Sequence, residues 1–216
     1  SSDVCSSDLQ QEVARVRQER SHAELLSEQA PHAGCVLLED IGPAAVRPRP
    51  DEVVIGISPA FAVDVWLTLS GITVGEALRQ LLAGIEEEGV AARVVRVTHS
   101  LDLGMIGWTA ATLSGSGVAL GIQGKGTALI HRADLPTLAN LELLSVAPLI
   151  DASRYRALGR NAARHARGDK PAPVLLPESG EAMGPRYHAK VVALITREAQ
   201  RIAPGEPQEV RVTWPT

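Results

Sequence analysis

The chain of 216 residues has few cysteines, few aromatic side chains, no long apolar run and no excess of basic charge. Its two cysteines, Cys5 and Cys35, are too few for a disulfide framework, and no histidines stand beside them at the spacing of a zinc site. Aromatic residues make up only 3% of the chain. This argues against a surface that stacks nucleic-acid bases. A reducing compartment is the simplest environment for such a chain.

Charge and hydropathy exclude two more classes of protein. The formal net charge is -4, with 21 basic and 25 acidic side chains, whereas general nucleic-acid binding depends on clustered basic charge. No apolar run reaches the roughly 20 residues of a membrane helix, and the first residues lack the pattern of a secretory signal. With 45% hydrophobic residues the chain has enough apolar surface for a core. We therefore expect a cytoplasmic protein with no nucleic-acid or membrane partner.

The first fifty residues are expected to lie outside the compact domain. Residues 1–9, SSDVCSSDL, resemble a translated adapter sequence and are left out of the fold prediction. Residues 10–29 predict an amphipathic helix. Residues 31–50 contain four prolines and predict an extended arm.

The next segment alternates strands and helices. Residues 53–58 (VVIGIS) predict a buried strand, and residues 92–98 predict a second one. Between them Thr73 and Glu76 form a capping box that begins a helix. The acidic run at residues 86–88, at the end of this helix, is expected to be solvated. Strand, helix and strand in this order favour a parallel βαβ unit.

Residues 102–113 predict a second crossover helix that Asp102 caps. Strands at residues 118–123 and 127–131 are separated by residues 124–126, which is short enough for a hairpin. We therefore predict an α/β fold with a mixed, mostly parallel, Rossmann-like sheet that is covered by helices.

Helices are also expected at residues 151–167 and 187–202, with a linker at 171–177 and an edge strand at 209–213. The predicted organisation is an N-terminal leader, helix and arm (1–50), an α/β core (51–150) and a C-terminal helical extension (151–216).

The glycine-rich segment from Leu113 to Ile150 contains the motifs most relevant to function. It lacks the dinucleotide fingerprint, because position 120 is leucine, and it lacks the Walker loop, because Lys125 is followed by Gly126. The turn at residues 124–126 offers one cation and backbone N–H groups that are free to approach an anion or a carbonyl, or it is a solvated hairpin tip. Asn140 is expected to cap a turn at residues 141–144.

No catalytic or metal site is predicted in this chain. The six histidines share no spacing of helical metal ligands, and no nucleophile, base and orienting acid can be assembled.

Several blocks of the sequence resemble the medium (β) subunit of adenosylcobalamin-dependent diol and glycerol dehydratases, over about residues 38–199. They include DEVVIGISPAF, LSGSGVALGIQGKGTALIH, LANLELLSVAPLI and PRYHAKVVALI. The resemblance implies a three-layer α/β/α domain with a mixed sheet. It also implies a heterohexamer of large, medium and small subunits, two copies each. It places the catalytic residues and the radical dehydration on the large subunit. The medium subunit would support the lower face and the nucleotide tail of the corrin.

The resemblance also implies which residues contact adenosylcobalamin. The corrin carries amides, which need paired donors and acceptors when buried, and its tail carries one phosphodiester that suits Lys125 or glycine N–H groups. The signature Asp-x-His-x-x-Gly is absent, which implies base-on cobalamin with no cobalt ligand from this chain. The positions that match the family's contacts are Asp102, Lys125, Thr127, Leu138, Asn140 and Ser145, with Ser114 and Ser116 as second choices.

Two alternatives remain open at this point. One is the small subunit of a dehydratase-reactivating factor, which has a similar fold and exchanges with the medium subunit. The other is a separate nucleotide-binding α/β domain. The sequence leaves open both the preference between glycerol and 1,2-propanediol and a location inside a bacterial microcompartment.

Overall fold

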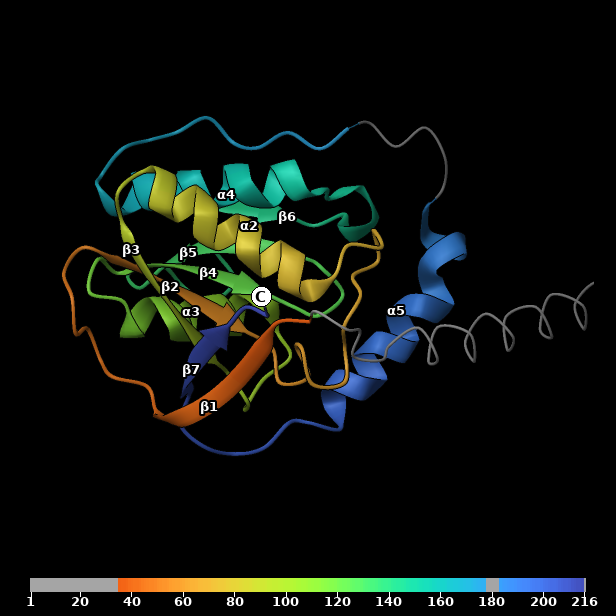
Figure 1. The fold of residues 1–216 in the computed structure, drawn as a ribbon. Coiled ribbons are helices and arrows are strands. Elements are labelled where there is room, and N and C mark those ends of the chain that lie inside the picture. The colour runs from red at the N-terminus through yellow and green to blue at the C-terminus, as the bar shows by residue number, and fades with distance from the viewer. Residues whose placement is uncertain (1–34, 178–182, 216) are drawn as a thin grey trace, which may run out of the picture.

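The computed structural model describes residues 35–177 and 183–215. A seven-stranded sheet lies between α2 and α4 on one face and α3 on the other, while α5 stands beside this sandwich (Figure 1). The strands are β1 (Leu37–Pro43), β2 (Glu52–Ile57), β3 (Ala91–Arg96), β4 (Val118–Ile122), β5 (Ala128–Arg132), β6 (Glu142–Leu144) and β7 (Gln208–Thr213). The helices are α2 (Val74–Glu87), α3 (Leu103–Leu113), α4 (Ala152–Ala166) and α5 (Met183–Ala199), with a short 3-10 helix η1 (Ala147–Leu149).

The strand order is β1-β7-β3-β2-β4-β5-β6. Strand β2 pairs in parallel with β3 and β4, which form the centre of the sheet. The outer pairings, β4 with β5, β5 with β6, β3 with β7 and β1 with β7, are antiparallel. The α/β class, the mixed sheet and the β4–β5 hairpin are therefore confirmed. Within the described residues, however, the parallel part is limited to the three central strands.

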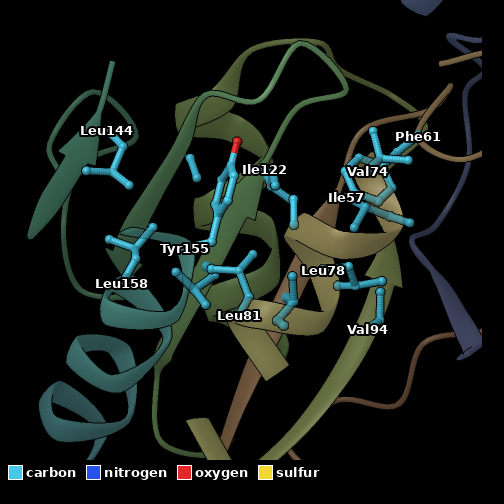
Figure 2. Close-up of a cluster of buried hydrophobic side chains, with 14 of the residues drawn as sticks. Ile57, Phe61, Val74, Leu78, Leu81, Val94, Ile122, Leu144, Tyr155 and Leu158 are labelled. Carbon is cyan, nitrogen blue, oxygen red and sulfur yellow. The ribbon is translucent and has the colours of Figure 1, made fainter. Parts of the chain in front are cut away.

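The central strand β2 is buried along its whole length because both of its faces are covered. Ile55 and Ile57 belong to the core cluster under α2 and α4, and Val54 belongs to the cluster under α3. Figure 2 shows part of the larger cluster, which includes Leu78 and Leu81 of α2. The apolar runs read from the sequence thus form two core clusters, one on each face of the sheet.

The expected helix starts are confirmed by their caps. The Thr73 hydroxyl accepts a hydrogen bond from the Glu76 N–H at 3.1 Å at the start of α2. The Asp102 carboxylate accepts one from the Met105 N–H at 2.8 Å at the start of α3. Each cap satisfies a backbone donor that the first helical turn leaves without a partner.

The N-terminal arm differs from its prediction. Residues 37–43 form β1, which pairs antiparallel with β7, so β7 lies between β1 and β3 instead of at the edge. An irregularity between Asp40 and Gly42 interrupts the register. Pro43 is the last residue of this strand and does not interrupt it, and edge strands tolerate proline. The helix predicted at residues 10–29 lies outside the described residues.

The sequence suggested that the acidic end of α2 is simply solvated, but the structure shows ion pairs there. Glu87 pairs with Arg156 and Arg160 of α4. Glu88 pairs with one further arginine of α4 and with the arginine that caps the end of that helix. The hydrogen bonds from Arg156 and Arg160 lower the pKa of the Glu87 carboxyl. These surface pairs hold α2 and α4 in register, although exposed pairs contribute little free energy each.

Two glycines let α2 and α4 approach closely. A β-carbon on Gly84 would lie 2.1 Å from the carbonyl oxygen of Arg156. One on Gly159 would lie 2.3 Å from the carbonyl oxygen of Leu81. Because these neighbours are backbone atoms, they cannot rotate away, and both helix positions require glycine.

We therefore expect Gly84→Ala to destabilise the protein by about 2 kcal/mol or more, because overpacking the helix contact outweighs the better helix propensity of alanine. Urea denaturation measures the change in the free energy of unfolding. Glu86→Ala, at an exposed position of the same helix, is the control and should change stability by about 0.5 kcal/mol at most. A neutral Gly84→Ala variant would contradict this packing.

Candidate functional site

Three of the predicted cofactor contacts gather where β2, β3 and β4 end. In open α/β sheets, ligands bind outside the carboxyl ends of the parallel strands. Lys125 and Thr127 come from the turn between β4 and β5, and Ser145 follows β6. All three line a cavity of about 230 Å³, whose other walls include Leu69 and Val191. We refer to this end of the sheet as the carboxyl edge.

Gln123 joins Thr127 to the loop that carries Asp102. The Gln123 side-chain amide donates a hydrogen bond to the carbonyl oxygen of Leu101 at 2.5 Å. Its carbonyl oxygen accepts one from the Thr127 hydroxyl. Asp102 follows Leu101 directly and is exposed. The structure thus connects Asp102 with the cavity through a residue that the sequence analysis did not select.

The turn at residues 124–126 is held by hydrogen bonds rather than free. The Gly124 N–H donates to the Glu198 carboxylate at 2.9 Å and to the Ser58 hydroxyl at 3.1 Å. The Gly126 N–H donates to the carbonyl oxygen of Gln123 at 2.9 Å. The expectation that these two glycine N–H groups are free to meet an anion is therefore wrong.

The carbonyl groups of the same turn are also bonded. The Leu69 N–H donates to the carbonyl oxygen of Lys125 at 3.0 Å. The buried Tyr155 hydroxyl donates to that of Gly126 at 2.7 Å. Gly126 has a φ of +105°, a conformation that favours glycine. The backbone around Lys125 is consequently fixed from several sides.

The Lys125 ammonium has no hydrogen-bond or ion-pair partner among residues 35–177 and 183–215. Its side chain also lines a second, smaller hollow of about 100 Å³, next to Leu194 of α5. Burial lowers the pKa of Lys125, and attraction to Glu198 partly opposes this shift. A partly buried cation without a partner is unfavourable unless a ligand compensates it.

Leu138 and Asn140 lie in the loop between β5 and β6. Leu138 is 89% exposed. The preceding residue, Thr137, has its carbonyl oxygen 2.3 Å from where a β-carbon on Gly104 would stand, so the loop passes the first turn of α3 beside Asp102. Asn140 is exposed and precedes strand β6 rather than the turn that was predicted there.

Ser114 and Ser116 are separated from the other candidates. They lie between α3 and β4, at the opposite end of the parallel strands. Both hydroxyls donate to the carbonyl oxygen of Glu52, at 2.9 Å and 2.6 Å. Glu52 also accepts the Gly115 N–H and pairs with Arg93. These contacts give the two serines a structural role, because they fix the start of β2.

Glu198 at the end of α5 is the main polar residue that the sequence analysis missed. Its side chain is buried, with only 5% of the residue exposed. It accepts hydrogen bonds from the Ser58 hydroxyl, the Ala60 N–H and the Gly124 N–H. The one signal in the sequence is its spacing from Val191 and Leu194, which puts all three on one face of the helix.

The carboxyl edge is equipped to hold a ligand. It presents one cation, hydroxyl groups and apolar walls, which suit a ligand with an anionic group, hydrogen-bonding groups and apolar surface. Within the described part of the chain, no three His, Cys, Asp or Glu side chains gather as a metal site. None of the helices described is long and apolar enough to cross a membrane.

Comparisons with known proteins give one matching family and two similar solved structures. A family model described as "Dehydratase medium subunit" matches residues 58–172, somewhat more than half of the chain. A solved "Glycerol dehydratase reactivase" chain is similar at 23% identity and a TM-score of 0.44, over 58% of this chain and 96% of that one. A diol dehydratase-reactivating factor, solved with ADP and Mg²⁺, gives 24% identity and a TM-score of 0.42, over 59% and 97%.

The buried Glu198 carboxyl also leads us to predict how stability depends on pH. Burial raises its pKa, although the hydrogen bonds from Ser58, Ala60 and Gly124 oppose the shift. The folded state therefore binds this proton more tightly than the unfolded state. The ordinary pKa of a glutamate is 4.5. As the pH rises from this value through the raised pKa of Glu198, ionisation of the carboxyl costs stability.

We expect the unfolding free energy of the wild type, relative to that of Glu198→Gln, to fall as the pH rises and then to level off. Urea denaturation of both proteins between about pH 4 and pH 8 measures this difference. A difference that grows with pH would mean that the folded state favours the ionised carboxylate.

Proposed function

Since the chain belongs to the dehydratase medium-subunit family, we propose that it holds adenosylcobalamin in a diol or glycerol dehydratase. In this proposal it supports the lower face and nucleotide tail of the corrin at the carboxyl edge. The chain assembles with large and small subunits, two copies of each. The complex is a lyase that works in the cytoplasm or inside a bacterial microcompartment.

The observation that carries this proposal is the partly buried Lys125, which has no partner in the described residues and lines a cavity with Thr127 and Ser145. A phosphodiester would supply the missing negative charge. Cobalamin has one such group, in its nucleotide tail, and its other side groups are mostly neutral amides. The donor set of the carboxyl edge therefore fits the cofactor.

Each remaining residue has a role in this arrangement. Thr127, Ser145 and Asn140 would pair with corrin amides, which need partners when buried. One oxygen of the Asp102 carboxylate caps α3. The other oxygen would accept a hydrogen bond from an amide. Leu138 would cover an apolar part of the ring.

When bound, adenosylcobalamin supplies the radical chemistry of the dehydration, which we assign to the large subunit. The residues of this chain bind and orient the cofactor, and none of them is proposed to be catalytic. The cofactor is proposed to be base-on. No histidine of this chain then ligates the cobalt, and no His→Ala variant should change the cofactor's absorption spectrum.

Co-expression with a large and a small dehydratase subunit tests the proposal. We expect a stable complex that retains cobalamin and forms aldehyde from 1,2-propanediol or glycerol only when adenosylcobalamin is present. A stable monomer that binds no cobalamin would refute the proposal. Assembly with an ATPase-like partner in place of the large subunit would identify a reactivating factor.

Lys125→Met should weaken cobalamin binding by the complex about tenfold, because one charge-assisted contact to the phosphodiester is lost. Equilibrium dialysis followed by absorbance measures the dissociation constant. Lys170→Met is the matched control, since Lys170 is exposed in the loop after α4, and it should leave binding unchanged. Equal affinities of the two variants would show that Lys125 does not contact the cofactor.

A further inference from the structure

The last turn of α5 touches the turn that carries Lys125. We propose that Glu198 is a positioning residue, which fixes the backbone at Gly124 and so aims Lys125 at the anionic tail of the cofactor. This inference rests on the proposed function. Glu198 itself does not touch the ligand in this proposal.

The geometry of the Glu198 carboxylate supports the role. One oxygen accepts the Gly124 N–H at 2.9 Å and the Ser58 hydroxyl, and the other accepts the Ala60 N–H at 2.8 Å. Ser58 and Ala60 follow β2, and Gly124 follows β4. A single buried carboxylate thus connects the ends of two neighbouring parallel strands. Hydrogen bonds to a charged acceptor are stronger than those between neutral groups.

The approach is too close for any side chain at position 124. A β-carbon on Gly124 would lie 2.7 Å from the Glu198 carboxylate oxygen and 2.7 Å from a methyl group of Val65. The Cα–Cβ bond of the neighbouring Lys125 therefore leaves this turn in a direction that the backbone fixes. The glycine before the lysine is explained by the carboxylate and not by a need for flexibility.

The C-terminal end of α5 is itself anchored to the loop after β2. Arg197 donates to the carbonyl oxygen of Asp64 at 2.7 Å. Arg201 pairs with the Asp64 carboxylate at 2.5 Å and 3.0 Å. These contacts hold Glu198 in place from both sides along the chain. The helix end and the lysine turn form one connected unit.

Charge in this unit is arranged to leave Lys125 available. Glu198 attracts the Lys125 ammonium, yet the two form no ion pair within 4.0 Å. The carboxylate oxygens are instead used by N–H and hydroxyl donors. The ammonium keeps its charge for an external anion, while the carboxylate fixes the backbone that presents it.

The test compares cobalamin with cobinamide, which lacks the nucleotide and its phosphodiester, on the complex with large and small subunits. Glu198→Ala should weaken cobalamin binding about tenfold, as expected for the loss of a charge-assisted contact. Cobinamide binding should change by less than about twofold. In a Lys125→Met background, Glu198→Ala should cause no further loss, because the two residues act through one interaction.

The matched control is Glu142→Ala. Glu142 is buried to a similar extent, and its carboxylate also accepts a backbone N–H, that of Val174, and the side-chain amide of Asn161. It begins β6, whereas Ser145 follows the end of that strand. Glu142→Ala should leave the affinity for both ligands unchanged.

An equal loss for cobalamin and cobinamide, additive losses with Lys125→Met, or no loss would overturn the role of Glu198. If Glu198→Ala fails to fold, Glu198→Gln keeps the shape of the side chain and removes its charge. It should then give the same selective pattern with a smaller loss, and an unchanged affinity counts against the inference. If the wild-type complex retains no cobalamin, the proposed function itself fails.

Discussion

The backbone of the turn between β4 and β5 is fixed by hydrogen bonds from distant parts of the chain, and the candidate site depends on this constraint. Leu69 comes from the segment before α2, Tyr155 from α4 and Glu198 from α5. The site can form only when the core, α4 and α5 are all in place. A ligand would therefore meet an already ordered edge, which lowers the entropy cost of binding.

Much of the fold could be predicted, because the central strands are continuous apolar runs and the helices begin at recognisable caps such as Thr73 and Asp102. The periphery was harder. Residues 37–43 looked like a proline-rich arm, since an exposed strand has a weak pattern, and its partner β7 lies far away in sequence. The strand predicted at residues 209–213 does join the sheet as β7, but only its long-range pairing with β1 shows that residues 37–43 belong there too.

The site was predicted in part because a family resemblance identified residues that the fold then brings to one edge. Lys125, Thr127 and Ser145 share a cavity, whereas Ser114 and Ser116 are explained by their bonds to Glu52. Glu198 was missed despite its helical spacing from Val191 and Leu194, because a glutamate in a charged helix end normally faces solvent. Hydrogen bonds between distant segments decided its burial, and local sequence carries no record of them.

The position of β7 between β1 and β3 has a consequence for how the chain folds during its synthesis. Among the described residues β1 pairs only with β7, so the first strand of this sheet has no neighbour until the last one has been synthesised. Pairings of such wide sequence separation form late and slowly. During translation, the exposed edge of β3 and the waiting β1 are the surfaces that a chaperone would have reason to shield.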